Sequence, residues 1–295
     1  MTKQKALLIK EKRLARKKNP QNRRKKNRPR LIKGYHAIKL KESLDLPMNN
    51  EWIKNKKIIV MVHFYYHRLL KEIFKYIDQF PLDIDLWVSI VSTDPMGGDI
   101  KTQEKIKYIE KKYKNVRIFI VPNKGKDIGG KLKLMKEYLK ENKYHDWIIF
   151  AHDKDGVEGR VKRQQLLAAI FHLPHVKKIL YAFKNDTTIK MCGGGVREGA
   201  FASDTICSGL SNKGHIEELL PKFKIKKIPD TTAFVGGTMF WVDAPFYKKY
   251  FKNINIDNII KYLEEGNVRE PSYTHAIERI FGIIVTHKGY KIGGI

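Results

Sequence analysis

The amino-acid sequence predicts an α/β protein with a mainly parallel sheet flanked by helices. The first observation is that four short apolar runs alternate with three amphipathic segments between residues 57 and 151. This βαβαβαβ order produces parallel strands joined by crossover helices, which pack on the faces of the sheet. The second observation is the content of 42% hydrophobic and 11% aromatic residues in a chain of 295 residues. That composition supports a substantial core and excludes a wholly disordered chain.

The predicted strands are short, continuous apolar runs, as expected of strands that are buried on both faces. They are Lys57–His63, Asp85–Ser92, Val116–Val121 and Trp147–Ala151. The segments between them repeat apolar residues at the helical spacing of i, i+3, i+4 and i+7. This spacing predicts helices over residues 65–78, over Lys101–Lys112, and over a stretch striped by Ile128, Leu132, Met135 and Leu139.

The second half of the chain is less regular and is expected to complete the same domain over residues 57–295. We expect helices over Arg163–Asn185 with a break near Pro174, and a glycine- and serine-rich loop over residues 192–216. The later expected elements are a strand at Thr238–Val242, a helix that begins at Pro245, a helix at Ser272–Ile284 and an edge strand at Tyr290–Ile292.

The positive charge is concentrated at the N-terminus. The chain has 59 Lys+Arg against 31 Asp+Glu, a net charge of +28, and residues 1–33 alone hold 15 Lys/Arg and one acid. This segment has few large apolar residues and no aromatic ones, which predicts a disordered basic arm followed by a lead-in over residues 34–56. Such an arm suits an anionic membrane surface or another polyanion; a solubilising tail is the alternative.

The composition also excludes several classes of protein. The two cysteines, Cys192 and Cys207, cannot form a disulfide scaffold or a four-thiolate zinc site. No run approaches 18 apolar residues, and the basic start lacks the apolar stretch of a secretory signal. We therefore expect a cytoplasmic protein, peripheral on the inner face of a membrane if the arm binds one.

Two segments carry polar side chains past the carboxyl ends of the predicted strands, where parallel sheets bind ligands. NKGKDIGG, residues 123–130, follows the third strand, and its glycines and exposed amides suit a phosphate. An ordinary turn at Gly125 and an N-cap at Asp127 are the alternative. HDKDG, residues 152–156, follows the fourth strand, where Asp153 and Asp155 could together hold a divalent cation. A plain turn would explain this second motif equally.

Two later segments complete the candidate set. In FVGGTMFWVDAP, residues 234–245, a Gly-Gly bend leads into an aromatic strand, which could place Trp241 beside a sugar ring; a core strand with a bulge is the alternative. In the last predicted helix, His275, Glu278 and Arg279 stand at i, i+3 and i+4 opposite the apolar face. They offer an imidazole, a base and an anion-binding guanidinium, although a solvated helix face shows the same pattern.

Together and in this order, the segments resemble the rhamnan synthesis F family, glycosyltransferase-like proteins of bacterial cell-surface polysaccharide assembly. The resemblance runs from about residue 57 to the C-terminus, with GTMFW (residues 237–241) and HAIER (residues 275–279) as its most specific blocks. It implies a GT-A-type fold with a nucleotide-sugar half over residues 57–160 and an acceptor half over residues 161–295. It also implies transfer of a deoxysugar, typically rhamnose from a dTDP donor, to a growing or lipid-linked glycan.

A more distant resemblance, to the large inverting glycosyltransferase family, implies roles for single residues through N-x-G after the third strand and D-x-D after the fourth. By this resemblance Asn123, Gly125 and Asp127 would line the donor site. Four other residues that follow or end predicted strands are further candidates for it: His63, Thr93, His152 and Lys154. Asp153 and Asp155 would hold Mg²⁺ or Mn²⁺ at the donor diphosphate. The rhamnan family more often has a histidine-lysine pattern with a hydroxyl residue at this place, so direct binding of the diphosphate by His152 and Lys154 is the other possibility.

The resulting hypothesis is an inverting glycosyltransferase. Glu278 or His275, beside Arg279, would activate the acceptor hydroxyl, and the acceptor would lie at Gly236, Gly237, Thr238 and Trp241. Two other functions stay open. A non-catalytic sugar- or nucleotide-binding module on the same fold would bind a donor without turnover. A polyanion-binding protein would act through residues 1–33 in a salt-dependent manner.

Overall fold

The computed structural model describes most of the chain from residue 37 onward: residues 37–40, 47–48, 50–92, 94, 99–155, 159–198, 211–229, 232–266 and 269–295. The chain divides into Met1–Ile32 and Lys33–Ile295, and all described residues belong to the second part. The predicted basic arm, residues 1–33, lies outside the described residues, as do Thr93, Gly156 and Cys207.

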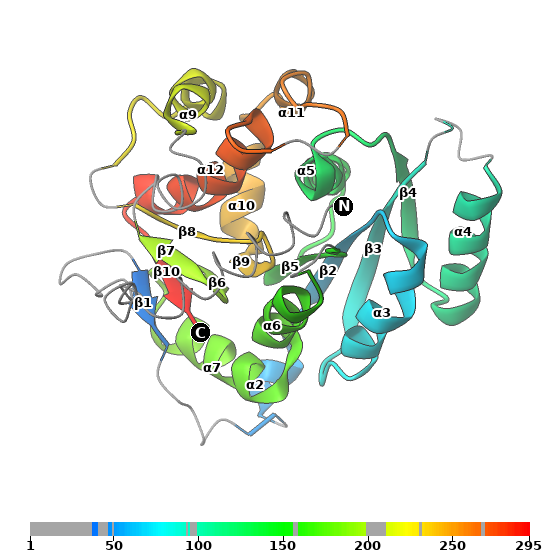
Figure 1. Ribbon diagram of the computed structural model, residues 1–295. Coiled ribbons are helices and arrows are strands. Elements are labelled where there is room, and N and C mark those ends of the chain that lie inside the picture. Colours follow the sequence, from blue (N-terminus) through cyan, green and yellow to red (C-terminus); the bar gives the residue numbers. More distant parts are fainter. Residues whose placement is uncertain are drawn as a thin grey trace, which may run out of the picture. The chain divides into compact units, whose positions relative to one another are not determined.

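A mixed sheet of eight strands forms the centre of the described part (Figure 1). Its order is β1-β10-β6-β9-β5-β2-β3-β4, and neighbouring strands are parallel except where β9 pairs with β5 and β6. The strands are β1 Ala37–Lys39, β2 Ile58–Phe64, β3 Ile84–Val91, β4 Arg117–Val121, β5 Trp147–His152, β6 Ile189–Gly193, β9 Phe240–Asp243 and β10 Lys291–Gly294. The predicted mainly parallel sheet is confirmed.

The four strands predicted from apolar runs are β2 to β5, and they create a switch point in the sheet. From β2 the chain moves outward through β3 to β4 and then returns to the other side of β2 to form β5. At such a point the connections leave in opposite directions and open a crevice at the carboxyl ends of the strands. The register pairs His63 of β2 with His152 of β5, which places both histidines at this edge.

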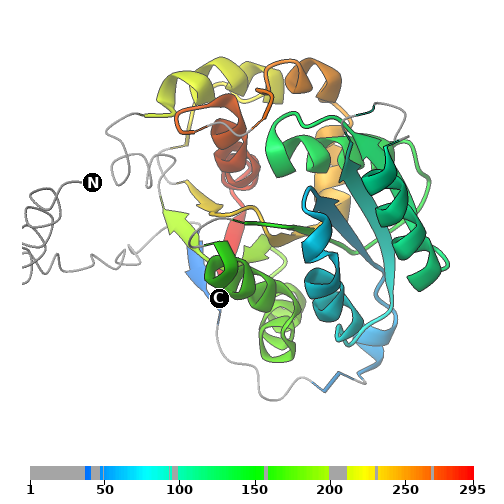
Figure 2. The ribbon, with the colours of Figure 1, turned by 45° about the vertical axis from the view of Figure 1, so that its right-hand side comes forward.

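Helices cover both faces of the sheet (Figures 1 and 2). Residues of β2 alternate between two cores, with Val60 and Val62 in one and Ile59 and Met61 in the other. The first core is covered by α2 Glu51–Lys54, α3 Leu70–Asp78, α4 Ile100–Lys112, α6 Gly159–Phe171 and α7 Leu173–Asn185. The second is covered by α5 Lys126–Leu139, α9 Lys213–Leu219, α10 Ala244–Phe251, α11 Ile256–Ile260 and α12 Tyr273–His287.

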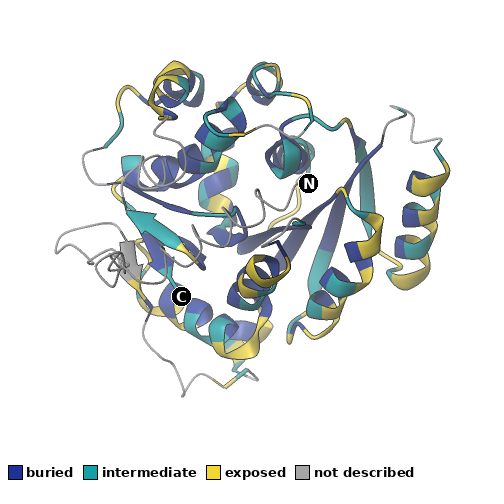
Figure 3. Ribbon diagram, in the orientation of Figure 1, coloured by how far each residue is buried: buried dark blue, intermediate teal, exposed yellow. Residues whose placement is uncertain are grey.

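Burial follows this layered arrangement. Figure 3 shows the central strands buried and the exposed residues gathered on the outer sides of helices such as α3 and α4. Every residue of β2 and of β5 is buried, as the continuous apolar runs predicted. The two buried histidines at the ends of these strands are therefore polar groups in an otherwise apolar layer, and they need partners there.

The second half differs from the expectation in several places. The expected loop over residues 192–216 includes the end of β6, β7 Val196–Glu198 and the start of α9, while residues 199–210 lie outside the described part. β7 pairs with β8 Ala233–Val235 in a separate two-stranded sheet. The last strand, β10, is not at an edge, because β1 pairs beyond it and comes from the segment expected to be a lead-in.

Among the described helices, none is by itself both long and apolar enough to cross a membrane. The consecutive helices α6 and α7 meet this requirement only when taken together, and their axes are bent by 49° at the break between them.

Candidate functional site

A cavity of ≈ 360 Å³ lies at the switch point, at the carboxyl ends of β2 and β5. Many of the residues predicted for the donor and metal sites line it: His63, Asn123, Asp127, His152, Asp153, Lys154 and Asp155. Tyr65, Tyr66, Lys126 and Gly266 complete the lining. Two motifs about thirty positions apart, one after β4 and one after β5, thus converge on one cavity at the carboxyl edge of the parallel strands.

A buried polar cluster closes one side of the cavity and is centred on Lys131 of α5. The Lys131 ammonium lies 2.5 Å from Asp127 Oδ2, 3.1 Å from His152 Nδ1 and 3.1 Å from Thr238 Oγ1. The Thr238 hydroxyl also donates to Asp127 Oδ2. This cluster joins the NKGKDIGG motif, the HDKDG motif and the GTMFW block through direct hydrogen bonds.

The protonation states within the cluster follow from burial and from the ion pair between Lys131 and Asp127. Burial opposes ionisation of Asp127, but His152 and Lys131 together hold the pKa of its carboxyl well below the ordinary value. Burial lowers the pKa of His63 to about 4 and holds the pKa of His152 well below its ordinary value. At neutral pH the site therefore contains an ionised Asp127 beside Lys131 and a neutral His63 imidazole, which contacts Ser89 Oγ at 2.9 Å.

The glycines of NKGKDIGG have structural reasons to be glycine. Gly125 caps α5 with φ at 68°, in the left-handed region, and its N–H donates to the Glu264 carbonyl oxygen at 2.7 Å. A Cβ on Gly130 would fall 2.0 Å from His63 Nδ1, so α5 can approach β2 only without a side chain there. The alternative of a turn residue is correct for Gly125, since its amide already has a partner inside the protein.

Asp153 and Asp155, the residues expected to hold a divalent cation, both line the cavity and both contact donor groups of the protein. Asp153 Oδ2 accepts the backbone N–H groups of Tyr65, at 2.8 Å, and Tyr66, while Asp155 pairs with Arg68. Within the described residues, no group of three or more His, Cys, Asp or Glu side chains is arranged to hold a metal ion. One oxygen of each carboxylate, Oδ2, is therefore already engaged by a donor of the protein.

The protonation of Asp153 predicts a pH-dependent stability. Burial raises the pKa of its carboxyl to about 7, although the Tyr66 and Tyr65 amides act in the opposite direction. In the unfolded chain an aspartate titrates at about pH 3.9, so between about pH 4 and 7 the folded state holds a proton that the unfolded state has lost. The free energy of unfolding should therefore fall as the pH rises through this window, by at most about 1.4 kcal/mol per pH unit.

Urea unfolding at pH 5 and pH 8 checks this expectation. Asp153→Asn should lose less stability over this interval than the wild type, because it removes the titrating group. Asp83→Asn, which alters an exposed carboxylate, serves as the control and should follow the wild-type profile. Equal pH profiles for Asp153→Asn and the wild type would contradict the prediction.

The His275–Arg279 segment of α12 lies beside this cavity rather than in its lining. Glu278 Oε1 accepts the backbone N–H of Gly237 at 2.5 Å, and His275 Nδ1 lies 2.6 Å from Ser272 Oγ. Burial lowers the pKa of Lys126 and of Lys131, and the Glu278 carboxylate acts on both in the opposite direction. Glu278 is therefore close to the charged side of the cavity and to the turn that carries Gly236 and Thr238.

Two predicted site residues are buried in the core instead. Arg279 was expected to offer its guanidinium to an anion, with a solvated helix face as the alternative. Its side chain is instead 0% exposed, donates to the His275 carbonyl oxygen at 2.7 Å and lies over the Phe234 ring. Trp241 was expected beside a sugar, but it packs between Phe80 and Trp147, and its indole N–H donates to the Ile170 carbonyl oxygen. Neither residue offers a surface to a ligand, so the core-strand alternative is correct for Trp241.

The sequence patterns missed several residues of the site. Tyr66 was assigned to the apolar stripe of a helix, whereas Tyr65 and Tyr66 precede the helical turn and line the cavity. Lys126 has φ at 50°, in the left-handed region that costs a lysine energy, and such strain often marks functional positions. Tyr65 and Tyr66 could have been found from the sequence by their position directly after β2, where parallel sheets bind ligands.

Comparison with known proteins places this geometry in a family. The model of the rhamnan synthesis protein F family matches residues 25–290. Two proteins of Xanthomonas campestris pv. campestris, both named uncharacterized protein WxcX, are 24% identical (strain B100) and 25% identical (strain ATCC 33913) over 208 residues. Each match covers 65% of this chain and 27% of the relative, so the chain spans about a quarter of the length of these relatives. Because the family model matches most of the chain, the protein belongs to the rhamnan synthesis protein F family.

Proposed function

We propose that the protein is a glycosyltransferase of polysaccharide synthesis with a GT-A-type fold. It moves a sugar, rhamnose or another deoxysugar, from a nucleotide-diphosphate donor to a growing or lipid-linked glycan. Membership of the rhamnan synthesis protein F family supports the role in polysaccharide synthesis. The main support for transfer from a nucleotide-sugar donor is the cavity at the switch point. This cavity is lined by lysines and tyrosines that follow three different strands.

The donor binds in this cavity, with its diphosphate toward the lysines. Lys126 stands at the first turn of α5 and Lys154 follows β5, so two ammonium groups from different elements face one space. Tyr65, at 44% exposure, and Tyr66 offer aromatic surface for the nucleoside or the sugar at the rim. Arg163, at the start of the helical region predicted after HDKDG, is buried and donates hydrogen bonds to Glu72 and to the Lys154 carbonyl oxygen, so we do not assign it to the diphosphate.

The leaving diphosphate is neutralised by these lysines and not by a cation on Asp153 and Asp155. The support is that one oxygen of each carboxylate is already engaged by a donor of the protein, whereas two lysines line the same cavity. An ammonium group can hold a phosphate by charge-assisted hydrogen bonds without a metal. The sequence left open whether a cation or the pair His152 and Lys154 binds the diphosphate. The proposal keeps Lys154 for this role and adds Lys126.

Transfer occurs with inversion at the anomeric carbon, and Glu278 acts as the base. The acceptor oxygen forms a bond to the anomeric carbon, and the bond from that carbon to the diphosphate oxygen breaks. The proton of the acceptor hydroxyl passes to the Glu278 carboxylate, and the nucleoside diphosphate leaves with the bonding electron pair. Gly236, Gly237 and Thr238 form the turn beside Glu278, and the acceptor lies along this turn.

Donor binding by the lysines can be measured directly. In Lys126→Gln/Lys154→Gln, the dissociation constant for a nucleotide sugar such as dTDP-rhamnose should rise by about 10²–10⁴-fold, because two charge-assisted hydrogen bonds of roughly 1.5–3 kcal/mol each are lost. Isothermal titration with and without a chelator is the measurement, and Lys133→Gln on the outer side of α5 is the control. Loss of binding on chelation would contradict the metal-free assignment.

The basic N-terminal segment suggests where this reaction takes place. We propose a cytoplasmic location at the inner face of a membrane, since residues 1–33 carry 15 Lys/Arg and one acid and anionic lipid attracts such segments. The full chain should sediment with phosphatidylglycerol-containing vesicles and not with pure phosphatidylcholine vesicles. Deleting residues 1–33 should weaken this binding at least about tenfold, and undiminished binding would overturn the proposal.

A further inference from the structure

A second cavity lies at the opposite edge of the sheet from the switch-point site. β9 pairs antiparallel with β5, and Asp243 lies opposite Trp147, so β9 ends at the amino ends of the parallel strands. α10 starts at this edge, and Tyr290 stands directly before β10 at the same edge. Between these elements lies a cavity of ≈ 420 Å³, large enough for one or two sugar residues.

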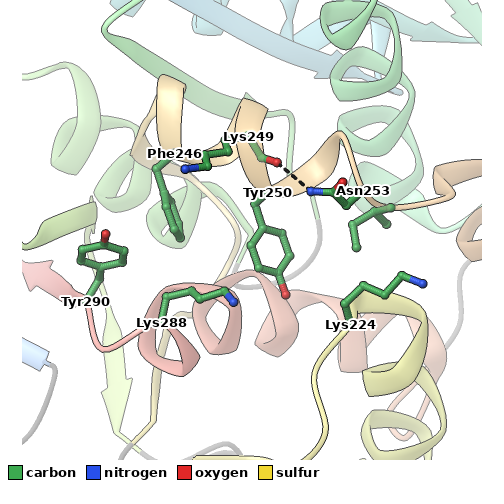
Figure 4. Close-up of a pocket in the computed structure, with 8 residues that line it drawn as sticks. Lys224, Phe246, Lys249, Tyr250, Asn253, Lys288 and Tyr290 are labelled. Carbon is green, nitrogen blue, oxygen red and sulfur yellow. Dashed lines mark hydrogen bonds between the residues drawn. The ribbon is translucent and has the colours of Figure 1, made fainter.

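Three lysines surround this cavity, and no acid accompanies them. Lys224 follows the 3-10 turn Leu220–Phe223, Lys249 is on α10, and Lys288 ends α12 (Figure 4). All three are exposed, and no Asp or Glu is among the described residues that line the cavity. None of the three forms an ion pair with any carboxylate in the described ranges. The cavity therefore has a local excess of positive charge that an anion would neutralise.

Aromatic rings form the wall between these lysines. Phe246 and Tyr290 meet edge to face with ring centroids 5.1 Å apart, and Tyr250 is held by the hydrogen bond from its hydroxyl to the Phe223 carbonyl oxygen at 2.6 Å. The Lys288 ammonium lies 5.9 Å from the centre of the Tyr250 ring. The rings are half-buried, so each keeps part of its apolar surface toward the cavity.

We propose that this cavity binds an anionic saccharide, a sugar residue that carries a phosphate or a carboxylate group. The C–H face of the sugar ring packs on the aromatic wall, and the anionic substituent binds the lysines. A nucleotide base fits less well, because Phe246 and Tyr290 cross at 77° and form no pair of parallel walls. This inference rests on the proposed function: in a glycosyltransferase, the bound saccharide is part of the growing glycan. The cavity then holds the glycan at a second place, away from the donor site.

Titration with defined probes tests the proposal. An oligomannuronate tetrasaccharide carries carboxylates, glucose 6-phosphate carries a phosphate, and mannotetraose is uncharged. The protein should bind at least one charged probe, with affinity that falls as salt is added, and should bind the uncharged probe at least tenfold more weakly. In Lys249→Gln/Lys288→Gln, the dissociation constant for the charged probe should rise about 10–100-fold. Lys252→Gln, an exposed lysine outside the cavity, should leave it unchanged.

Four outcomes would overturn the inference. They are a failure of every charged probe to bind, equal binding of charged and uncharged probes, an unchanged dissociation constant in the double variant, and binding of dTDP that the double variant loses. Tyr290→Leu adds a second readout, because it should weaken the oligosaccharide more than it weakens inorganic phosphate.

The test of the saccharide site can be distinguished from the test of the proposed function, because these titrations contain no nucleotide-sugar donor. If nucleotide sugars fail to bind at the switch point while the charged oligosaccharide still binds here, the proposed function fails and the saccharide site stands. If nucleotide sugars bind as proposed and none of the charged probes binds here, only the second site fails.

Discussion

Glu278→Gln is expected to lower the turnover of sugar transfer by about 10²–10⁴-fold while leaving donor affinity within about twofold of wild type. A positioned general base contributes roughly this factor, and an amide cannot accept the proton of the acceptor hydroxyl. Glutamine keeps an oxygen for the Gly237 N–H, so the turn beside the site keeps its hydrogen bond. Steady-state rates of nucleoside diphosphate release, together with donor titration, separate the two effects.

The matched control for this variant is Glu265→Gln. Glu265 is an exposed carboxylate beside the NKGKDIGG motif, since Glu265 forms an isolated β-bridge with Lys124. It should keep wild-type turnover, since its side chain is not among those that line the cavity. A Glu278→Gln protein with wild-type turnover would remove Glu278 from the mechanism and leave His275 as the candidate base.

Lys131→Met is expected to reduce the free energy of unfolding by about 3–5 kcal/mol. The Lys131 side chain is 1% exposed and is the cation that balances Asp127, so its removal leaves a carboxylate without its nearest counter-charge. The substitution also removes the donor to His152 Nδ1. Urea or guanidinium unfolding followed by tryptophan fluorescence measures the change.

A double-mutant cycle shows whether the effect arises from the ion pair. In Asp127→Asn/Lys131→Met no buried charge is left unbalanced, so the double variant should be more stable than the sum of the single effects predicts by at least about 1 kcal/mol. Lys133→Met is the control on the same helix: Lys133 pairs with Glu137 at 2.7 Å near the surface, and such pairs contribute less than about 1 kcal/mol. Equal losses for Lys131→Met and Lys133→Met would contradict a structural role for the buried pair.

The parallel half of the fold could be predicted from the sequence because its patterns are local. The strands β2 to β5 are buried on both faces and read as continuous apolar runs, and each agrees with its predicted bounds to within one residue. The elements β1, β7 and β8 are three residues long and show no period. They exist because distant segments pair with them, as β10 does with β1, and single-sequence patterns do not contain that information.

The candidate site was predictable in position but only partly in detail. The rule that ligands bind past the carboxyl ends of parallel strands selected Asn123, Asp127 and His152, which line one cavity. The helical period did not predict burial of Arg279, because a buried arginine can occupy a core position when carboxylates, a carbonyl oxygen and an aromatic ring surround it. Lys131 was missed since a lysine in an amphipathic helix ordinarily faces solvent, and only the fold shows Asp127, His152 and Thr238 around it.

The central claim is that the switch-point cavity carries out glycosyl transfer from a nucleotide-sugar donor. The most direct measurement is incubation of the purified full chain with dTDP-rhamnose and a panel of other nucleotide sugars in the presence of a glycan acceptor. Nuclear magnetic resonance then follows nucleoside diphosphate release and the anomeric configuration of the product. An inverted product should form with at least one donor, and its formation should be lost in Glu278→Gln and weakened in Lys126→Gln/Lys154→Gln. Failure to bind or turn over any donor, or a product with retained configuration, would contradict the central claim.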